Sequence, residues 1–188
     1  SRWPAKRDGA HAIAGPGNYS RLGTRATTGD LDNDGVNEII VSAPGDDELG
    51  SYSGTVFLIR DPTVEFAVAA TDRFVGAGSS WQCCRLSIGD FDGDGIHDLA
   101  LGTPEAPNAA GGAWLFYGPI SGVGTMSVAS AAFHVESAKY PGNDYVGFEL
   151  HGADADGDGA DDLLIGASNS DDGGLESGAA YLFLGSGY

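Results

Sequence analysis

Three short segments of the chain concentrate carboxylates at one spacing, and this spacing is the strongest chemical signal in the sequence. Counted as nine positions each, the segments cover residues 30–38, 90–98 and 154–162. Acidic side chains fill positions one, three, five and nine: Asp30, Asp32, Asp34 and Glu38; Asp90, Asp92, Asp94 and Asp98; and Asp154, Asp156, Asp158 and Asp162. Such dense negative charge favours a hard cation, and Ca²⁺, which takes about six to eight oxygen ligands, fits better than Mg²⁺ or Zn²⁺. The segments therefore predict three calcium sites.

The residues at positions six and seven support the same interpretation. Position six is glycine in every copy, which permits the positive φ of a tight loop: Gly35, Gly95 and Gly159. The backbone carbonyls at position seven are further predicted ligands: Val36, Ile96 and Ala160. The spacing resembles the first half of an EF-hand loop, but the glutamate at position twelve is missing and a strand follows in place of a helix. A simple Asp-Gly-rich surface turn is disfavoured because the pattern occurs three times in the same context.

Short apolar runs on both sides of each acidic segment predict the strands that position it. A first strand is expected at 22–28, 85–88 and 148–151, and a second at 38–44, 98–104 and 162–168. A third is expected at 54–59, 112–117 and 178–184, and a looser fourth at 64–69 and 131–136. The first aspartates of the segments lie 60 and 64 residues apart. Four antiparallel strands repeated at this period favour blades of a β-propeller, in an all-β fold, over a sandwich.

The strand count also predicts how the blades are completed. The chain reads as a single region, 1–188, with blades at approximately 19–70, 80–137 and 144–188. The third blade lacks a fourth strand, and residues 10–14 supply a candidate closing outer strand. Because propellers have about four to eight blades, three are too few to close a ring. We expect either a homodimer that forms a six-bladed ring, with the N-terminal strand completing a partner's last blade, or a slice of a longer propeller.

Composition excludes several classes of function. Lys and Arg total 9 against 27 Asp and Glu, and the formal net charge of −18 disfavours nucleic acids and anionic membranes as partners. No apolar run approaches the roughly 20 residues that span a bilayer, no signal peptide opens the chain, and Ser1 indicates a processed or excised product. The adjacent Cys83 and Cys84 exclude a disulfide framework and a multi-cysteine zinc site, and a vicinal disulfide between them stays open.

A resemblance to a known family follows from these motifs. Asp-x-Asp-x-Asp-Gly-x-x-Asp between two strands, with Ser42-Ala43-Pro44 and Gly102-Thr103-Pro104 ending the second strand, resembles the FG-GAP repeat of integrin α-subunit propellers. Gly166-Ala167-Ser168 stands at the third such place, and the Phe-Gly motif itself has degenerated, as at Leu22-Gly23. The resemblance implies a calcium-binding, extracellular or cell-surface propeller for adhesion or protein-ligand recognition.

Other functions fit the sequence less well. We expect no enzyme, because no pair of histidines has metal-like spacing and no nucleophile elbow occurs. His97, at position eight of the second segment, is expected to point away from the ion. A lectin-like propeller is the main alternative, since exposed aromatic faces suit sugars: Trp3, Trp81, Trp114, Tyr19, Tyr140 and Tyr145. Of these, Trp114 is expected in the core. A further alternative is a three-blade fragment that has no ligand of its own until it assembles into a ring.

Overall fold

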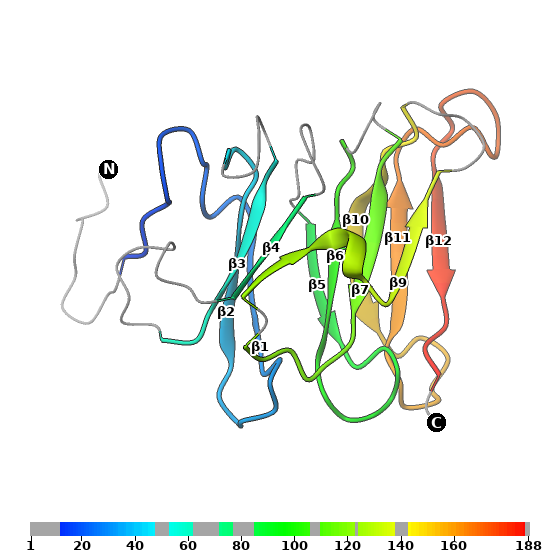
Figure 1. The fold of residues 1–188 in the computed structure, drawn as a ribbon. Coiled ribbons are helices and arrows are strands. Elements are labelled where there is room, and N and C mark those ends of the chain that lie inside the picture. The colour runs from blue at the N-terminus through cyan, green and yellow to red at the C-terminus, as the bar shows by residue number, and fades with distance from the viewer. Residues whose placement is uncertain are drawn as a thin grey trace, which may run out of the picture.

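Three β-sheets stand side by side in chain order (Figure 1). The computed structural model describes residues 12–47, 53–61, 72–76, 85–105, 110–122, 124–137 and 143–186. Neighbouring strands pair antiparallel except for one parallel pair in the first sheet, and the described residues contain no α-helix. Nor do they contain any helical segment long and apolar enough to cross a membrane. The predicted all-β fold is confirmed, and stacked antiparallel sheets of three to five strands are consistent with a β-propeller.

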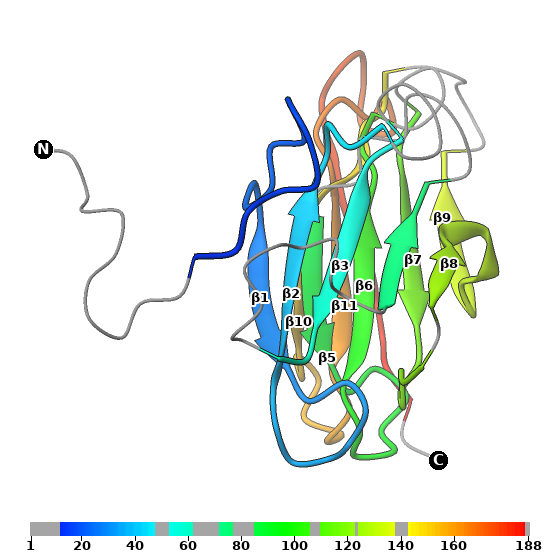
Figure 2. The same ribbon diagram turned by 60° about the vertical axis from the view of Figure 1, so that its left-hand side comes forward.

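The first sheet has the strand order β1-β2-β3-β4-β8. Its strands are β1 (Ala26–Gly29), β2 (Glu38–Ala43), β3 (Thr55–Ile59), β4 (Asp72–Val75) and β8 (Thr125–Ser127). The last of these pairs parallel with β4 and lies in the connection between β7 and β9 of the second sheet (Figure 2), so the chain returns to the first sheet before it completes the second. The sequence did not predict this strand.

The second sheet is a four-stranded meander and the third has three strands among the described residues. The second runs β5 (Arg85–Gly89), β6 (Asp98–Gly102), β7 (Gly112–Phe116) and β9 (Phe133–Glu136), with a short 3₁₀ turn at Val128–Ser130 before β9. The third runs β10 (Val146–Ala153), β11 (Asp162–Ala167) and β12 (Ala179–Phe183). The first three strands of each repeat therefore lie close to where the sequence placed them.

The fourth strand of the first sheet differs from the expectation. It was expected at 64–69, which lies outside the described residues, but the strand that pairs with β3 is β4, Asp72–Val75. The burial of Phe74 favours β4 as the fourth strand. Its side chain is fully buried, and its ring centroid lies 4.7 Å from that of Phe116 on the second sheet. The first blade therefore extends beyond residue 70, to Val75.

The core lies between the sheets. Successive side chains of the second sheet point alternately toward the first sheet and toward the third, so this sheet contributes to the core on both of its faces. Leu99, Leu101 and Trp114 pack toward the first sheet, whereas Ala100 and Leu115 pack toward the third. A strand that is buried on both faces reads as a continuous apolar run, as the β6 and β7 sequences do. Trp114 is 3% exposed, as expected for a core residue.

The two outer faces of the stack differ. On the first sheet, Val41, Ala43, Phe57 and Ile59 form a buried cluster against which Ile13 of the N-terminal segment packs. On the third sheet the exposed large apolar side chains include Leu164, Leu182 and Leu184. Residues 10 and 11 of the predicted closing strand lie outside the described residues, so its role in closing a ring stays a prediction.

Candidate metal centres

The three acidic segments form equivalent loops at one edge of the stack. Each connects the first two strands of its sheet, β1 to β2, β5 to β6 and β10 to β11, and all three loops lie at the lower edge in Figure 1. Antiparallel pairing brings the end of one strand beside the start of the next. Gly29 thus pairs with Glu38, Gly89 with Asp98, and Ala153 with Asp162. Because the residue before position one pairs with position nine, the two ends of each acidic loop lie side by side.

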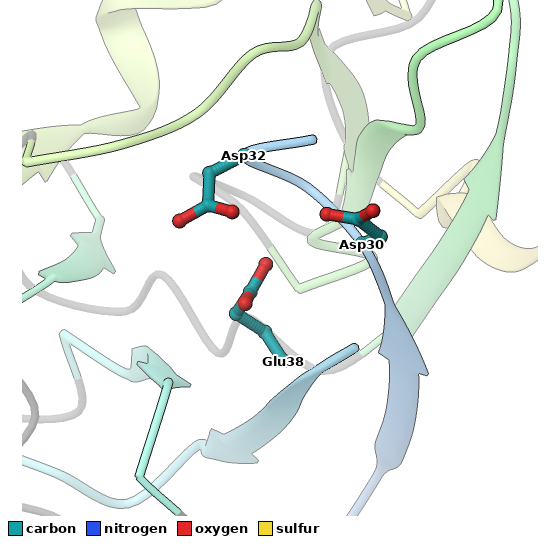
Figure 3. Close-up of side chains that lie close together, drawn as sticks. All are labelled: Asp30, Asp32 and Glu38. Carbon is teal, nitrogen blue, oxygen red and sulfur yellow. The ribbon is translucent and has the colours of Figure 1, made fainter. Parts of the chain in front are cut away.

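Carboxylates at positions one, three and nine converge in every loop. The clusters are Asp30, Asp32 and Glu38; Asp90, Asp92 and Asp98; and Asp154, Asp156 and Asp162, with one oxygen of each residue within 4.8 Å of the others. Figure 3 shows the first cluster, whose three carboxylates come from the loop and from the start of β2. The position-nine side chains are the most enclosed, at 2%, 0% and 1% exposed for Glu38, Asp98 and Asp162.

Backbone hydrogen bonds hold these carboxylates in place. The glycine N–H at position six donates to the position-one aspartate, for example from Gly35 to Asp30 Oδ2 over 2.9 Å, and the other two loops repeat this bond. The N–H at position two donates to position nine, as from Phe91 to Asp98 Oδ2 over 2.7 Å. All three glycines have positive φ, at 88°, 86° and 99° in chain order, as the sequence predicted.

The aspartates at position five lie outside the clusters. In each loop, Oδ1 of this residue accepts the N–H of position seven over 2.8 to 2.9 Å: Asp34 from Val36, Asp94 from Ile96, and Asp158 from Ala160. Of the four acidic side chains predicted per loop, the structure therefore brings three together. Metal ligation by position five and by the position-seven carbonyls stays a prediction.

In the part of the chain that the structure describes, no Lys or Arg pairs with the carboxylates of the second loop. Burial, reinforced by the charges of Asp92 and Asp90, raises the pKa of Asp98 to about 6, although the N–H groups of Gly118 and Phe91 act in the opposite direction. Burial also raises the pKa of Asp92. Asp90 Oδ1 is buried without a hydrogen-bond partner. A cluster with these properties fits a divalent cation, which would supply both the missing charge and the missing partner.

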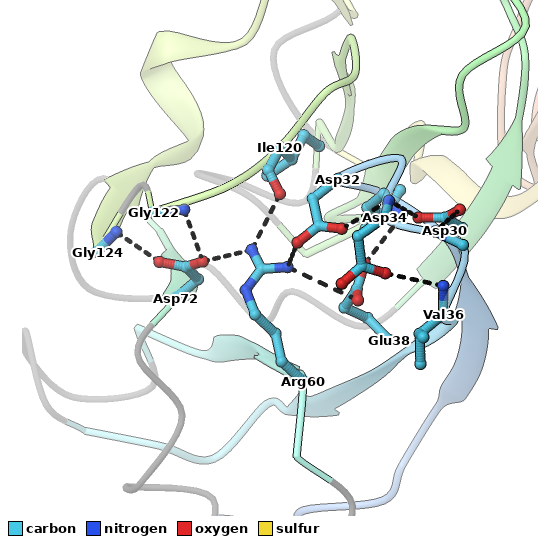
Figure 4. Close-up of polar contacts among 12 residues, drawn as sticks. Asp30, Asp32, Asp34, Val36, Glu38, Arg60, Asp72, Ile120, Gly122 and Gly124 are labelled. Atoms are coloured by element: carbon cyan, nitrogen blue, oxygen red, sulfur yellow. Dashed lines mark hydrogen bonds and ion pairs between the residues drawn. The ribbon is translucent and has the colours of Figure 1, made fainter.

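The carboxylates of the first loop are paired with an arginine from outside the loop. Arg60, one residue beyond β3, places Nη1 2.5 Å from Asp32 Oδ2 and 3.7 Å from Glu38 Oε1 (Figure 4). Burial raises the pKa of Glu38, and Arg60 opposes that rise. The sequence reasoning missed Arg60. The strand register could have indicated it. Ile39 of β2 pairs with Ile59 of β3, and continuing this pairing by one residue puts Arg60 opposite Glu38.

The third loop follows the plan of the second. Asp162 accepts the N–H of Ala155 through Oδ2 over 2.8 Å and the N–H of Gly185 through Oδ1 over 2.9 Å, whereas Asp154 and Asp156 are exposed. Among the described residues, no ion pair joins the acidic cluster of the second or third loop to a Lys or Arg. The donors in all three clusters are carboxylate oxygens, which hard cations prefer to the nitrogen and sulfur ligands typical of zinc.

Position eight of the second and third loops joins each of them to the loop before it. His97 Nδ1 accepts the N–H of Asp30 over 3.2 Å, and Asp161 Oδ2 accepts the N–H of Asp90 over 3.0 Å. His97 thus contacts the neighbouring loop, in agreement with the expectation that it points away from its own. These contacts between loops were not predicted. The only sequence signal for them is a polar residue at position eight in each copy, with Asn37 in the first.

Comparison with known proteins agrees with this description. The FG-GAP repeat family matches residues 22–59 and 85–116. Phosphatidylinositol-glycan-specific phospholipase D of Rattus norvegicus is 30% identical over 88% of this chain and 20% of its own length. Integrin alpha-PS5 of Drosophila melanogaster is 30% identical over 76% of this chain and 14% of its own, and human integrin alpha-IIb is 28% identical over 84% and 16%.

Residues 22–59 and 85–116 match FG-GAP repeats, and the chain is homologous to integrin α subunits and to this phospholipase D. The homology supports a β-propeller interaction module. The chain spans about a fifth of the length of the phospholipase D, whose name is that of an enzyme, and 14 to 16% of the length of the two integrins. The acidic clusters are groups that could hold a metal ion.

Proposed function

We propose that this protein is a calcium-stabilised β-propeller interaction module that acts outside the cell or at its surface. The observation that carries the proposal is the repeated convergence of three carboxylates, at positions one, three and nine, in loops that connect buried strands. Bound Ca²⁺ would neutralise these clusters and tie the two strand ends of each loop together. With three ions the formal charge would change from −18 to −18 + 6 = −12, so the surface would stay acidic.

Calcium titration by calorimetry tests the metal part of the proposal. We expect saturable, heat-detectable binding of Ca²⁺ that millimolar Mg²⁺ does not reproduce, because Mg²⁺ demands a stricter octahedral geometry. The variant Asp98→Asn should lose one site, since it removes a buried oxyanion of the second cluster. Asp47→Asn, outside the clusters, serves as the control for nonspecific loss of charge. Absence of any binding would overturn the proposal of calcium.

Recognition of a macromolecular partner, rather than catalysis, is the function we propose for the module. The homology to integrin α subunits supports this, and so does the role of the acidic clusters in fixing loops. In a pull-down from extracellular material, a protein partner should be retained with calcium and released by chelator. Hydrolysis of a phosphatidylinositol-glycan substrate by the purified chain would contradict the non-enzymatic assignment.

Ring assembly is the second part of the proposal. The exposed leucines on the outer face of the third sheet support a further blade on that side, whereas Ile13 already packs on the outer face of the first sheet. We propose that two chains form a six-bladed ring or that other blades of a longer chain complete it. Light scattering on a sizing column in millimolar calcium should give about twice 19.2 kDa for the homodimer. A mass of one chain would remove the homodimer and leave the longer chain.

Carbohydrate binding remains the alternative on the same scaffold. Tyr19 supports it, because its ring is 88% exposed, whereas Trp81 and Trp3 lie outside the described residues. A glycan array decides between the two functions. Saturable binding that weakens in Tyr19→Ala or Trp81→Ala would favour a lectin, and uniform silence would favour recognition of protein.

A further inference from the structure

The cross-strand neighbour of position nine differs among the three repeats. Continuing the register of β2 with β3 by one residue puts Arg60 opposite Glu38. In the second sheet Leu99 pairs with Phe116, so the next residue, Tyr117, lies opposite Asp98. In the third sheet Leu163 pairs with Phe183, so Leu184 lies opposite Asp162. One structural place therefore holds a permanent cation in the first repeat, a phenol in the second and an aliphatic side chain in the third.

Contacts on both sides fix Arg60 in this place. Toward the loop it forms ion pairs with Asp32 and Glu38, two of the three clustered carboxylates. On the other side Nη2 lies 2.6 Å from Asp72 Oδ2 and 3.0 Å from the carbonyl oxygen of Ile120 (Figure 4). A guanidinium held by four oxygen-bearing groups in a planar fork is poorly able to move aside for an entering ion.

Asp72 strengthens this anchor. Its carboxylate is 1% exposed and accepts the N–H groups of Gly122 and Gly124 over 3.2 and 2.8 Å. Burial acts to raise the pKa of Asp72, but the bond to Arg60 and these N–H groups lower it overall. Moving Arg60 toward solvent would leave Asp72 as a buried charge without its counter-ion, which is costly.

We infer that Arg60 is the resident cation of the first loop and replaces a divalent ion there, so that calcium fills only the second and third loops at micromolar concentration. This inference rests on the proposed calcium function. Repulsion between Arg60 and a divalent ion, together with the loss of the bonds from Arg60 to Asp32 and Glu38, should weaken calcium binding at the first loop by at least about tenfold.

Native mass spectrometry of the chain in micromolar Ca²⁺ counts the bound ions and tests the inference. Wild type should bind two ions. Matched variants at position three then identify the loops: Asp32→Asn should leave the count at two, whereas Asp92→Asn and Asp156→Asn should each lower it to one. A wild type with three ions that loses one in Asp32→Asn would overturn the inference and leave the proposed calcium function standing. A count of zero would overturn both.

Exchange of the neighbouring residue between repeats provides the converse test. Arg60→Leu copies the third repeat into the first and should raise the count from two to three. Leu184→Arg copies the first repeat into the third, at a side chain that is 61% exposed, and should lower the count to one. If Arg60→Leu fails to fold, Leu184→Arg still decides, because an unchanged count of two in that variant contradicts the effect of the guanidinium.

Discussion

The first and second acidic loops share their spacing, their backbone hydrogen bonds and a buried carboxylate at position nine, but they compensate charge differently. In the first loop Arg60 lies against Asp32 and Glu38. In the second, Asp98 has its pKa raised to about 6 by burial and by the nearby aspartates, and Asp90 keeps a buried oxygen without a partner. The comparison teaches that identical ligand motifs can give sites of different metal dependence when one residue outside the motif changes.

Removal of calcium should have the largest effect, and it tests whether the second loop depends on an ion. Two sites filled at about 100 times Kd contribute roughly 5 kcal/mol in total, so excess EDTA should lower the Tm by roughly 10 to 20 °C. Differential scanning calorimetry with and without chelator measures this shift. An unchanged Tm would mean that the folded state does not need a metal ion at the second loop. The two loops would then not differ in metal dependence.

Removal of the guanidinium should have the next largest effect, and it tests the first loop. In excess EDTA, Arg60→Met leaves Asp72 and Glu38 buried without a counter-ion, and we expect a loss of about 3 kcal/mol in unfolding free energy. Tyr117→Met, at the equivalent place in the second repeat, should cost less than about 1 kcal/mol. Urea unfolding of both variants measures the difference. Equal losses would show that Arg60 does not act through charge.

Local sequence patterns predicted the loops because their chemistry is local. Position spacing, the glycine at position six and the following strand all lie within ten residues, and the structure has them in place. What the pattern missed depends on pairing between distant residues. Arg60 reaches an aspartate 28 residues away, and His97 and Asp161 contact N–H groups 67 and 71 residues away. A single sequence does not show which of its polar residues such a register brings together.

The misplaced fourth strand has a similar cause. The segment 64–69 is apolar except for Glu65, and its valines and phenylalanine favour a strand. In contrast, β4 begins with the charged pair Asp72 and Arg73, which reads as a turn. The burial of Asp72 depends on Arg60 and on the N–H groups of Gly122 and Gly124, which lie in the connection between β7 and β9. These partners are visible only in three dimensions.

Acidification of the calcium-free protein should sharpen the comparison at the level of a single side chain. Because the pKa of Asp98 is raised from 3.8 to about 6 in the folded state, the folded state binds its proton more tightly than the unfolded state does. The contribution of Asp98 to stability is therefore highest below about pH 4, falls as pH rises from 4 to 6 and stays low above 6. The difference in unfolding free energy between wild type and Asp98→Asn isolates this change, which should reach at most about 3 kcal/mol. A pH-independent difference would contradict it.

The smallest expected effect concerns the contacts between loops. Asp161→Ala removes the acceptor of the Asp90 N–H and should cost about 1 kcal/mol in urea unfolding. Asn37→Ala changes the corresponding position of the first loop, where the side chain is exposed, and should stay within about 0.5 kcal/mol. Equal effects would mean that position eight contributes nothing beyond its own loop.

The contacts at position eight give the molecule the character of a one-dimensional array with nearest-neighbour coupling. His97 and Asp161 each bind the backbone of a residue that opens the preceding carboxylate cluster, so the conformation of one repeat is communicated to the next along the chain. In such an array the end units are the least supported, because each has one neighbour where an internal unit has two. In the isolated chain we therefore expect the second repeat, which packs against a sheet on each face, to be the most stable. The third repeat, whose Leu164 and Leu182 are exposed, should be less stable.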